Sequence, residues 1–560
     1  MSAPGPADEL VFLPLGGSGE IGMNLNAYGY GPADERKWII VDVGVTFGGP
    51  NEPGVDLIMP DPTFLETVRE DILAIVLTHA HEDHIGAIGW LWPRLKAPVY
   101  ATPFTAALVA DKLEERGLDK RVPLHVVPLK GALEFGPFTV EFVTLTHSIP
   151  EPNGLLVKTP LGAVFHTGDW KIDPDPMIGE PTDFAAIDRM RAGGVLAMVC
   201  DSTNVFVEGH AGSEADVRAA LIEALKRFRG KVAITAFASN VARVESACIA
   251  AKAAGREVCL VGRSMHRIVG AAKATGVLPA ALGFLTEEEA ALAPDENVLY
   301  LCTGSQGEER AALTRIASGD HRRVSLGEGD VVLFSSRVIP GNEAAIFALY
   351  EKLGERGVEV LTDKDAPIHV SGHPCREELR QMYAMVRPQI AVPVHGERRH
   401  ILEHVKLAEE LQTPQAIAAR NGEMIRLAPG RAAVIDETPA GRLYVDGGML
   451  VRSEDETFRE RKKLARDGAV TVTIVASAKK KAILSGPEIR IVGLAGEEDD
   501  GADQALEDLA EAAEGAYARL SGAERADEEA AEEIISRAVR RAAERIWGKR
   551  PVVETVLMNI

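Results

Sequence analysis

The chain has 560 residues, of which 46% are hydrophobic and 26% charged, as in a globular protein with several folding units. Its 61 basic and 83 acidic side chains give a net charge of −22, which argues against a broad basic surface for nucleic acid. Residues 497–533 alone hold 15 acidic and 2 basic side chains, so the remaining chain carries only −9. Local basic patches therefore remain compatible with the composition, and an RNA or DNA substrate is not excluded.

The cellular compartment is constrained by what the sequence lacks. Five cysteines occur without a CxxC pair, so neither a disulfide framework nor a zinc knuckle is expected. The first residues lack the basic and then apolar layout of a secretory signal, and no run of about 18 apolar residues occurs. These features predict a cytoplasmic protein that does not enter a membrane.

Apolar, β-rich segments alternate with amphipathic ones over the first 400 residues, which predicts α/β architecture with sheets covered on both faces. Polar clusters follow several of these strands, at the sheet edge where ligands usually bind. Helices are expected at 214–229 and 241–254. Strands are expected at 38–43, 72–78, 139–146, 163–166, 195–199, 232–235, 257–261, 298–302, 331–335 and 390–394.

The pattern changes after about residue 451. The charged run Ser453–Lys463 is expected to be a linker or a solvated helix. A strand at 469–476, two Ala- and Glu-rich helices near 503–520 and 523–547, and a final strand at 551–560 predict a small α+β domain. Its acidic helices are poor candidates for RNA binding.

The strongest chemical signal is the segment Thr78–His84 (THAHEDH), which directly follows a predicted buried strand. Imidazole and carboxylate ligands together suit zinc or manganese. A surface histidine cluster is the alternative, but in a chain with 14 histidines such a pattern arises by chance on the order of once in a thousand. His147, Asp169 and His395 also lie at the ends of predicted strands, where they can complete a metal site.

This pattern resembles the dinuclear site of the metallo-β-lactamase superfamily, which implies two divalent metal ions per subunit, zinc or else manganese. The first ion would be held by His79, His81 and His147. The second would be held by Asp83, His84 and His395. Asp169 would bridge both ions, and Asp42 would orient a ligand imidazole from outside the ligand set.

Two adjacent cations activate a bound water and neutralise charge on a phosphate, so an acidic protein can still attack a polyanion. The same site also serves lactam, thioester and lactone hydrolysis, so the fold alone does not choose the substrate. Asp169 and His395 are 226 positions apart, which leaves room for an inserted α/β domain. The insertion resembles a β-CASP domain, which clamps nucleic acid over the metal site.

Local motifs make the resemblance narrower. Cys200–Asn204 (CDSTN) and His369–His373 (HVSGH) are similar to β-CASP motifs, and further matches lie at 237–243, 262–265 and 303–308. Together they resemble the ribonuclease J family over about residues 10–450, and more loosely over the last hundred. The implied organisation is a metallo-β-lactamase αββα sandwich (1–213 and 367–450), a β-CASP domain (214–366), a linker (451–465) and a C-terminal α+β domain (466–560).

The family implies a 5′→3′ exoribonuclease that prefers 5′-monophosphorylated RNA, with some endonuclease activity, in RNA decay and in rRNA and mRNA maturation. It also implies a homodimer or homotetramer, with other RNA-decay proteins as further partners. A terminal phosphate would be held in an anion nest of Gly and Ser groups. The residues expected to bind substrate are His369, Val370, Ser371, Gly372 and His373, with Arg263, Ser264, Gly304, Ser305 and Gln306 from the inserted domain.

Asp201 and His373 are the residues expected to transfer protons around the scissile phosphate. Asp201 has an alternative role, because an Asp before Ser-Thr-Asn readily caps a turn. Three other functions stay open at this point. They are a β-CASP endonuclease acting on DNA or on pre-RNA 3′ ends, a small-molecule metallo-hydrolase, and an RNA-binding scaffold without catalysis.

Overall fold

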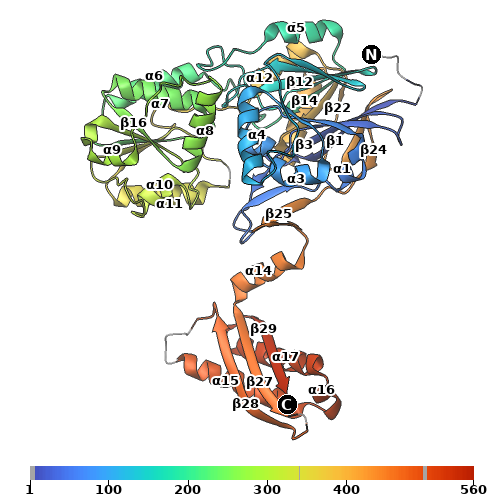
Figure 1. Cartoon of the computed structure of the whole chain (residues 1–560), viewed down its shortest axis with the longest axis vertical. Helices are drawn as coiled ribbons and strands as arrows, with labels where there is room; N and C mark the ends of the chain where they lie inside the picture. Colours follow the sequence, from blue (N-terminus) through green and yellow to red (C-terminus); the bar gives the residue numbers. More distant parts are fainter. Residues whose placement is uncertain (1–4, 6, 340, 478, 496–500) are drawn as a thin grey trace. The chain divides into compact units, whose positions relative to one another are not determined.

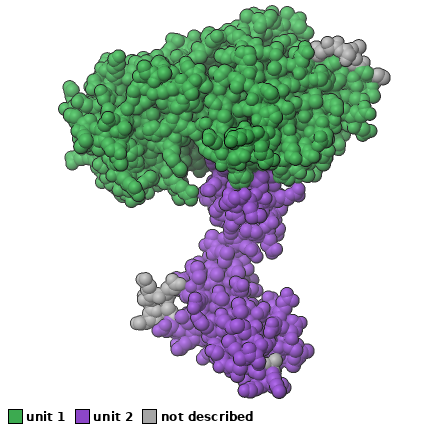
Figure 2. All heavy atoms as spheres, viewed as in Figure 1, with its two compact units in different colours: residues 1–46, 59–442 green, residues 47–58, 443–560 purple. Residues whose placement is uncertain are grey.

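A computed structural model describes residues 5, 7–339, 341–477, 479–495 and 501–560. Contacts divide the chain into two units, Met1–Thr46 with Met59–Arg442, and Phe47–Ile58 with Leu443–Ile560. Figure 1 labels the elements, and Figure 2 colours the first unit green and the second purple. The first four residues and part of the acidic stretch, 496–500, lie outside the described residues.

The first unit is built on two large sheets. The eight strands of the first sheet, from edge to edge, are β24 (Ala433–Glu437), β23 (Glu423–Ala428), β1 (Glu9–Gly16), β3 (Leu25–Gly31), β4 (Lys37–Val41), β7 (Ile72–Val76), β8 (Val99–Ala101) and β9 (Leu124–Val126). The seven strands of the second are β10 (Ala132–Phe135), β11 (Phe138–Thr144), β12 (Asn153–Thr159), β13 (Gly162–His166), β14 (Ala197–Asp201), β20 (Ile390–Val394) and β22 (Gln415–Ala416).

The two sheets share one apolar core. Phe12 and Val76 of the first sheet and Val157 and Val392 of the second belong to the same buried cluster. A second cluster joins the outer face of the second sheet to its covering helices α5 (Phe184–Gly193), α12 (Arg376–Val386) and α13 (Arg398–Glu410). The first sheet is accompanied by α1 (Thr63–Thr67), α2 (Glu82–Ile85), α3 (Ile88–Leu95) and α4 (Pro103–Glu115). The predicted αββα sandwich is therefore confirmed.

The segment of the chain that connects β14 to β20 forms a separate sheet of five strands, all of them parallel. Its order is β16 (Glu257–Val261), β17 (Val298–Cys302), β15 (Val232–Thr235), β18 (Val331–Phe334) and β19 (Glu359–Leu361). In Figure 1 helices lie on both sides of this sheet, as buried parallel strands require. They are α6 (Glu214–Leu225), α7 (Val241–Ala253), α8 (Arg263–Ala274), α9 (Glu287–Leu292), α10 (Ala312–Ala317) and α11 (Glu343–Glu355). The predicted inserted α/β domain is present, and its limits at 214 and 366 stay predictions.

A buried ion pair ties the two ends of this inserted domain together. Arg243, only 1% exposed, lies 3.0 Å from a carboxylate oxygen of Glu214 at the start of α6. The same guanidinium donates to the carbonyl oxygens of Ser335 at 2.7 Å and Ile368 at 3.2 Å. Burial alone would raise the pKa of Glu214, but the guanidinium of Arg243 lowers it, so the carboxylate stays charged. One side chain thus joins the segments where the chain leaves and re-enters the sandwich.

The second unit ends in a small α+β domain. Its sheet has the order β28 (Ala482–Val492), β27 (Ala469–Ser477) and β29 (Val552–Asn559), and α15 (Gly501–Arg519), α16 (Gly522–Ala526) and α17 (Glu528–Trp547) accompany it. The charged run before it forms helix α14 (Glu456–Asp467), and β5 (Thr46–Phe47), β6 (Leu57–Pro60), β25 (Arg442–Asp446) and β26 (Met449–Arg452) form a four-stranded sheet. The predicted helix near 523–547 is divided at Asp527, which caps α17.

Each of the ten strands expected in the first 400 residues overlaps an observed strand. Strand β28 was not predicted, because its exposed face carries Glu488 and Arg490 and so lacks an apolar run. Within the described part of the chain, no helix has both the length and the apolar character of a membrane span.

Replacing Arg243 by Met would leave the buried Glu214 carboxylate without its counter-charge. Removing one partner of a buried ion pair typically costs about 3–5 kcal/mol, so the free energy of unfolding should fall by that amount in chemical denaturation. The matched control is Arg218→Met, because Arg218 pairs with Glu245 where both side chains are more than 20% exposed. We expect a loss of about 1 kcal/mol or less there. Equal losses in both variants would contradict the role given to Arg243.

Candidate metal centre

The Thr78–His84 segment turns sharply after β7 and then forms the short helix α2. Asp83 and His84 lie within this helix, and His81 is its N-cap residue. The turn packs directly on the loop after β4, where a Cβ on Gly44 would lie 1.7 Å from the carbonyl oxygen of Asp83. A glycine is therefore required at position 44 for the histidines to reach the sheet edge.

A first group of ligand atoms lies around His81. Its Nδ1 is 3.2 Å from Nε2 of His79 and 3.0 Å from Nε2 of His147. Asp169 Oδ2 lies 3.8 Å from each of those two Nε2 atoms. The four side chains offer ligand atoms that all lie within 4.8 Å of one another, as the ligands of one cation must.

A second group shares Asp169 with the first. Oδ2 of Asp169 lies 3.2 Å from Nε2 of His84 and 3.4 Å from Nε2 of His395. Asp83 contributes its Oδ2 at 3.6 Å from both of those nitrogens. The seven side chains expected to bind metal are thus brought together, with the Asp169 carboxylate common to both groups.

The protonation of the first group suits metal binding. Burial, followed by the neighbouring imidazoles, lowers the pKa of His79 and His147 well below the usual value. Burial also lowers the pKa of His81, to about 4. These imidazoles are therefore neutral near pH 7, which is the form that donates a lone pair to a cation.

The centre of the cluster fits a cation better than an apo hydrogen-bond network. Both oxygens of Asp169 and the Nε2 of His395 are buried without a hydrogen bond of good geometry. Buried polar atoms normally find a partner, so unpaired atoms facing each other mark places where another group binds. Imidazole nitrogens and carboxylate oxygens are ligands of divalent zinc or manganese.

In four of the imidazoles, the ring nitrogen that points away from the cluster contacts an oxygen atom that holds the ring in place. Nδ1 of His84 lies 2.7 Å from Oδ2 of Asp42, a residue in the left-handed backbone region with φ 64°. Such outer contacts fix the tautomer and orientation of a metal-binding histidine. The other three contacts are His79 Nδ1 with Thr78 Oγ1 (3.0 Å), His147 Nδ1 with the carbonyl oxygen of Gly372 (2.5 Å), and His395 Nδ1 with Asn24 Oδ1 (3.1 Å).

Asn24 was missed by sequence reasoning. It lies more than 50 residues before the histidine segment and belongs to no motif, so only the fold reveals its contact with His395. Asp42 is placed as the resemblance implied, beside His84.

His373 and Asp201 meet at the edge of the cluster. His373 Nδ1 lies 2.8 Å from Oδ2 of Asp201 and 3.8 Å from Oδ2 of Asp169. Burial would lower the pKa of His373, but the carboxylates of Asp201 and Asp169 outweigh it and raise the pKa to about 9. Asp201 also accepts from the backbone N–H and hydroxyl of Thr203 through its other oxygen. Asp201 thus caps the turn through one oxygen and contacts His373 through the other, while its role in proton transfer stays a prediction.

Gly372 connects the 369–373 segment to the cluster, because its carbonyl oxygen contacts His147. Gly372 lies so close to His147 that a Cβ would be 2.8 Å from the imidazole Cε1 and 2.5 Å from Ser148 Oγ. Ser371 Oγ accepts hydrogen bonds from Asn204 Nδ2 at 2.8 Å and from the backbone N–H of His373 at 3.2 Å. Val370 packs beside Gly212.

His369 lies instead beside the Arg243 ion pair. Burial, followed by the charge of Arg243, lowers the pKa of His369 to about 3, and its ring contacts the backbone of Ser335. Its Nδ1 is buried without a partner. The exposed Arg337 also acts on this imidazole and was not singled out from the sequence.

The residues expected from the inserted domain are only partly placed near this site. Gln306 is held within its own domain. Its Nε2 donates to the carbonyl oxygen of Arg337 at 2.9 Å, and its Oε1 accepts from the backbone N–H of Ile339 at 3.0 Å. It adjoins Gly304, which has φ 111°, and the buried Ser305. Arg263 and Ser264 are exposed at the start of α8. Among the described residues, no hydrogen bond connects these two side chains to the metal ligands.

Comparison with known families agrees with this architecture. Residues 37–234 match the beta-lactamase superfamily domain, and residues 365–418 match the Zn-dependent metallo-hydrolase RNA specificity domain. Between them, residues 229–353 match the beta-CASP domain of ribonuclease J. Residues 456–560 match the ribonuclease J C-terminal domain.

Curated relatives extend over nearly the whole chain. Ribonuclease J of Sinorhizobium meliloti is 47% identical over 554 residues, covering 99% of this chain and 98% of that protein. Ribonuclease J of Mycobacterium tuberculosis is 39% identical over 498 residues, covering 88% of each. A crystal structure titled as a protein of unknown function from Enterococcus faecalis aligns over 75% of this chain and all of its own, with a TM-score of 0.50 and 16% identity, which bears on the fold alone.

A two-sheet sandwich with clustered His and Asp ligands and an inserted parallel-sheet domain defines a metallo-hydrolase of the β-CASP type. At 47% identity over 99% of its length, the chain belongs to the ribonuclease J family. The expected fold class and the expected class of enzyme, a metal-dependent ribonuclease, are confirmed.

Replacing Asp42 by Asn should weaken metal binding without removing a ligand. An amide N–H would face Nδ1 of His84, where a carboxylate oxygen now accepts, and the loss of such an outer contact typically lowers metal affinity about 10–100-fold. Titration of the metal-free protein with zinc against a chromophoric chelator measures this. The matched control is Asp71→Asn at a surface pair with Lys37, which should bind zinc like the wild type. Unchanged affinity in Asp42→Asn would refute the orienting role.

Proposed function

We propose that the protein is a 5′→3′ exoribonuclease that prefers RNA with a 5′-monophosphate, has some endonuclease activity, and acts in RNA decay and in rRNA and mRNA maturation. The observation that carries the proposal is the convergence of seven His and Asp side chains, in two groups that share Asp169. We further propose that these groups hold two divalent cations, zinc or else manganese. The ligands are His79, His81, Asp83, His84, His147, Asp169 and His395.

Bound in these positions, the cations supply an activated water and positive charge for the attacked phosphate. This local charge lets a protein of net charge −22 act on RNA. The small-molecule alternative is disfavoured, because the inserted domain contributes Ser239 directly to a ligand imidazole, His81. The scaffold alternative is disfavoured because none of the seven predicted ligands is missing from the cluster.

His373 is the proposed general acid. Its Nδ1 lies 2.8 Å from Oδ2 of Asp201, and this carboxylate raises the pKa of the imidazole and so favours its protonated form. A protonated imidazole can donate to the departing 3′-oxygen as the phosphodiester bond breaks. Asp201 then holds the ring in position and stabilises its charge.

The terminal phosphate is proposed to bind along the 369–373 segment. Ser371 Oγ already accepts two hydrogen bonds, so its own proton is available for a phosphate oxygen. Arg337 supplies positive charge beside His369.

The homodimeric or homotetrameric state stays a prediction, as do other RNA-decay proteins as partners and the cytoplasmic location. Endonucleolytic action on DNA or on pre-RNA 3′ ends remains the alternative function. An endonuclease of this kind would cleave RNA at the same rate whether the 5′ end carried a monophosphate or a triphosphate.

The activity is tested with one RNA labelled at its 3′ end and carrying either a 5′-monophosphate or a 5′-triphosphate. With zinc or manganese added, full-length RNA should disappear without discrete labelled intermediates, and faster for the monophosphate. EDTA or Asp169→Ala should abolish this loss, since Asp169 adjoins both ligand groups. Discrete internal cuts that ignore the 5′ end would favour the endonuclease, and no cleavage under any metal condition would refute the proposal.

Replacing His373 by Ala should remove the general acid while leaving the seven metal ligands in place. A positioned general acid contributes typically about 10²–10⁴-fold, so kcat on 5′-monophosphorylated RNA should fall within that range. Single-turnover cleavage and zinc content are measured on the same preparation. His400→Ala is the control, because His400 is a nearby histidine in α13 that is not among the seven proposed ligands and packs against the ring of Phe206. Wild-type kcat in His373→Ala would rule out the assigned role.

A further inference from the structure

His81 differs from the other ligand imidazoles in the way it is held. His79, His84, His147 and His395 point Nε2 into the cluster, and their Nδ1 atoms contact groups of the sandwich. His81 is reversed, because its Nδ1 faces Nε2 of His79 and Nε2 of His147. Its outward atom is therefore Nε2.

The contact of that outward atom comes from the inserted domain. Nε2 of His81 lies 3.1 Å from Oγ of Ser239, in the loop between β15 and α7. If Nδ1 gives its lone pair to a cation, the imidazole proton resides on Nε2 and is donated to the Ser239 hydroxyl. The two ring nitrogens and the serine oxygen are thus in the arrangement that fixes a metal-binding tautomer.

The Ser239 loop is firmly anchored within its own domain. The next residue, Asn240, caps α7 through its side chain and donates to Glu214 at 3.0 Å. Arg243, one turn into α7, makes the buried pair with the same carboxylate. Ser239 therefore belongs to the inserted domain, whereas His81 belongs to the sandwich.

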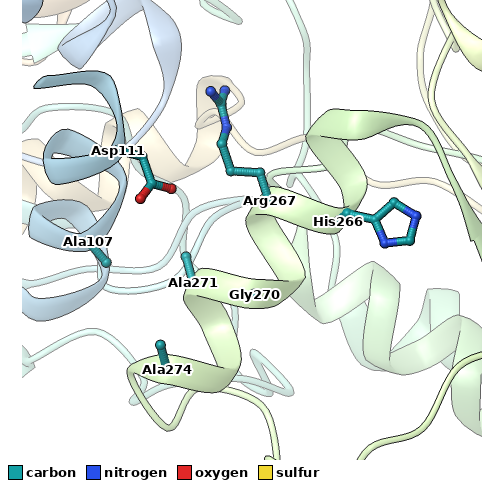
Figure 3. Close-up of a pocket in the computed structure, with 7 residues that line it drawn as sticks. All are labelled: Ala107, Asp111, His266, Arg267, Gly270, Ala271 and Ala274. Carbon is teal, nitrogen blue, oxygen red and sulfur yellow. The ribbon is translucent and has the colours of Figure 1, made fainter. Parts of the chain in front are cut away.

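The junction between the two domains holds a pocket and further ion pairs besides the Ser239 contact. A pocket of about 250 Å³ lies between α4 of the sandwich and α8 of the inserted domain. Figure 3 shows Asp111 on α4 and His266 and Arg267 on α8 around this space. Arg267 forms two ion pairs across the junction, 3.0 Å from Glu115 and 3.6 Å from Glu82. Ser239 is therefore one of several polar contacts that hold the inserted domain on the sandwich.

We propose that Ser239 is a positioning residue for the metal centre, so that metal affinity depends on the inserted domain being docked on the sandwich. The inference rests on the proposed function only in taking His81 as a metal ligand. By thermodynamic linkage, a contact that raises metal affinity in the docked state makes bound metal favour docking by the same factor. The enzyme would then hold its metal tightly only while the domain that covers the RNA is in place.

The test uses full-length protein freed of metal and titrated with zinc against a chromophoric chelator. Loss of an outer contact to a ligand imidazole typically weakens metal binding about 10–100-fold, and we expect Ser239→Ala to fall in that range. Ser239→Thr keeps the hydroxyl and should bind zinc within a few-fold of the wild type. Ser318→Ala is the matched control, because Ser318 is an exposed serine of the same domain whose hydroxyl accepts a hydrogen bond from Lys352.

Amide hydrogen exchange supplies a readout that a purely local role would not change. Zinc should slow exchange in α4 and α8 of the wild-type protein, and this effect should be smaller in Ser239→Ala. Wild-type affinity in Ser239→Ala, a loss that Thr does not restore, or equal zinc protection in both proteins would overturn the inference. A wild-type protein that binds no zinc or manganese would instead overturn the proposed function, so the two failures are distinguishable.

Discussion

One buried carboxylate is held among several imidazoles, and this is the arrangement that the fold has to maintain. Oδ2 of Asp169, a residue 2% exposed, lies within 3.8 Å of ring nitrogens of His79, His84, His147 and His395. Concentrating ionisable groups away from water is unfavourable unless a counter-charge and good geometry compensate. The cluster therefore has to be imposed by the surrounding fold, and the cations proposed above would compensate it.

The sandwich imposes it through the ends of its strands. Loops after β4, β7, β13, β14 and β20 meet at one edge, and the shared apolar core between the sheets fixes their spacing. Two of the residues involved, Asp42 and His395, have φ values of 64° and 51°, which are unfavourable for non-glycine residues. Strain of this kind persists only where the surrounding packing determines the conformation, and such sites are commonly functional.

The sequence predicted the parts of this site that depend on short-range patterns. His79, His81, Asp83 and His84 lie within six residues, and His147, Asp169 and His395 each follow a strand that its apolar run identifies. Asn24 and Ser239 were not assigned roles, because their contacts with His395 and His81 join residues that are distant in sequence. No local pattern carries such information.

The residues predicted to bind substrate also make contacts that short-range sequence patterns do not reveal. Gly372 contacts His147 through its carbonyl oxygen, and Ser371 Oγ accepts from Asn204 and from the backbone N–H of His373. Gln306 is polar and follows a strand, like a ligand-binding residue, but its amide is occupied in holding the 337–339 loop. Sequence shows which donors are present, whereas only the fold shows which are already satisfied.

The position of the insertion adds a constraint on how the site is assembled. Asp169 and Asp201 precede the inserted domain, whereas Gly372, His373 and His395 follow it. The centre is complete only when the chain has returned from the inserted domain and β20 is paired with β14. Arg243 contacts Glu214 near the departure point and Ile368 near the return point, so one buried guanidinium brings both crossings together. The insertion is therefore part of the framework of the proposed metal centre, because its closed ends help determine where His395, the last of the seven side chains, lies.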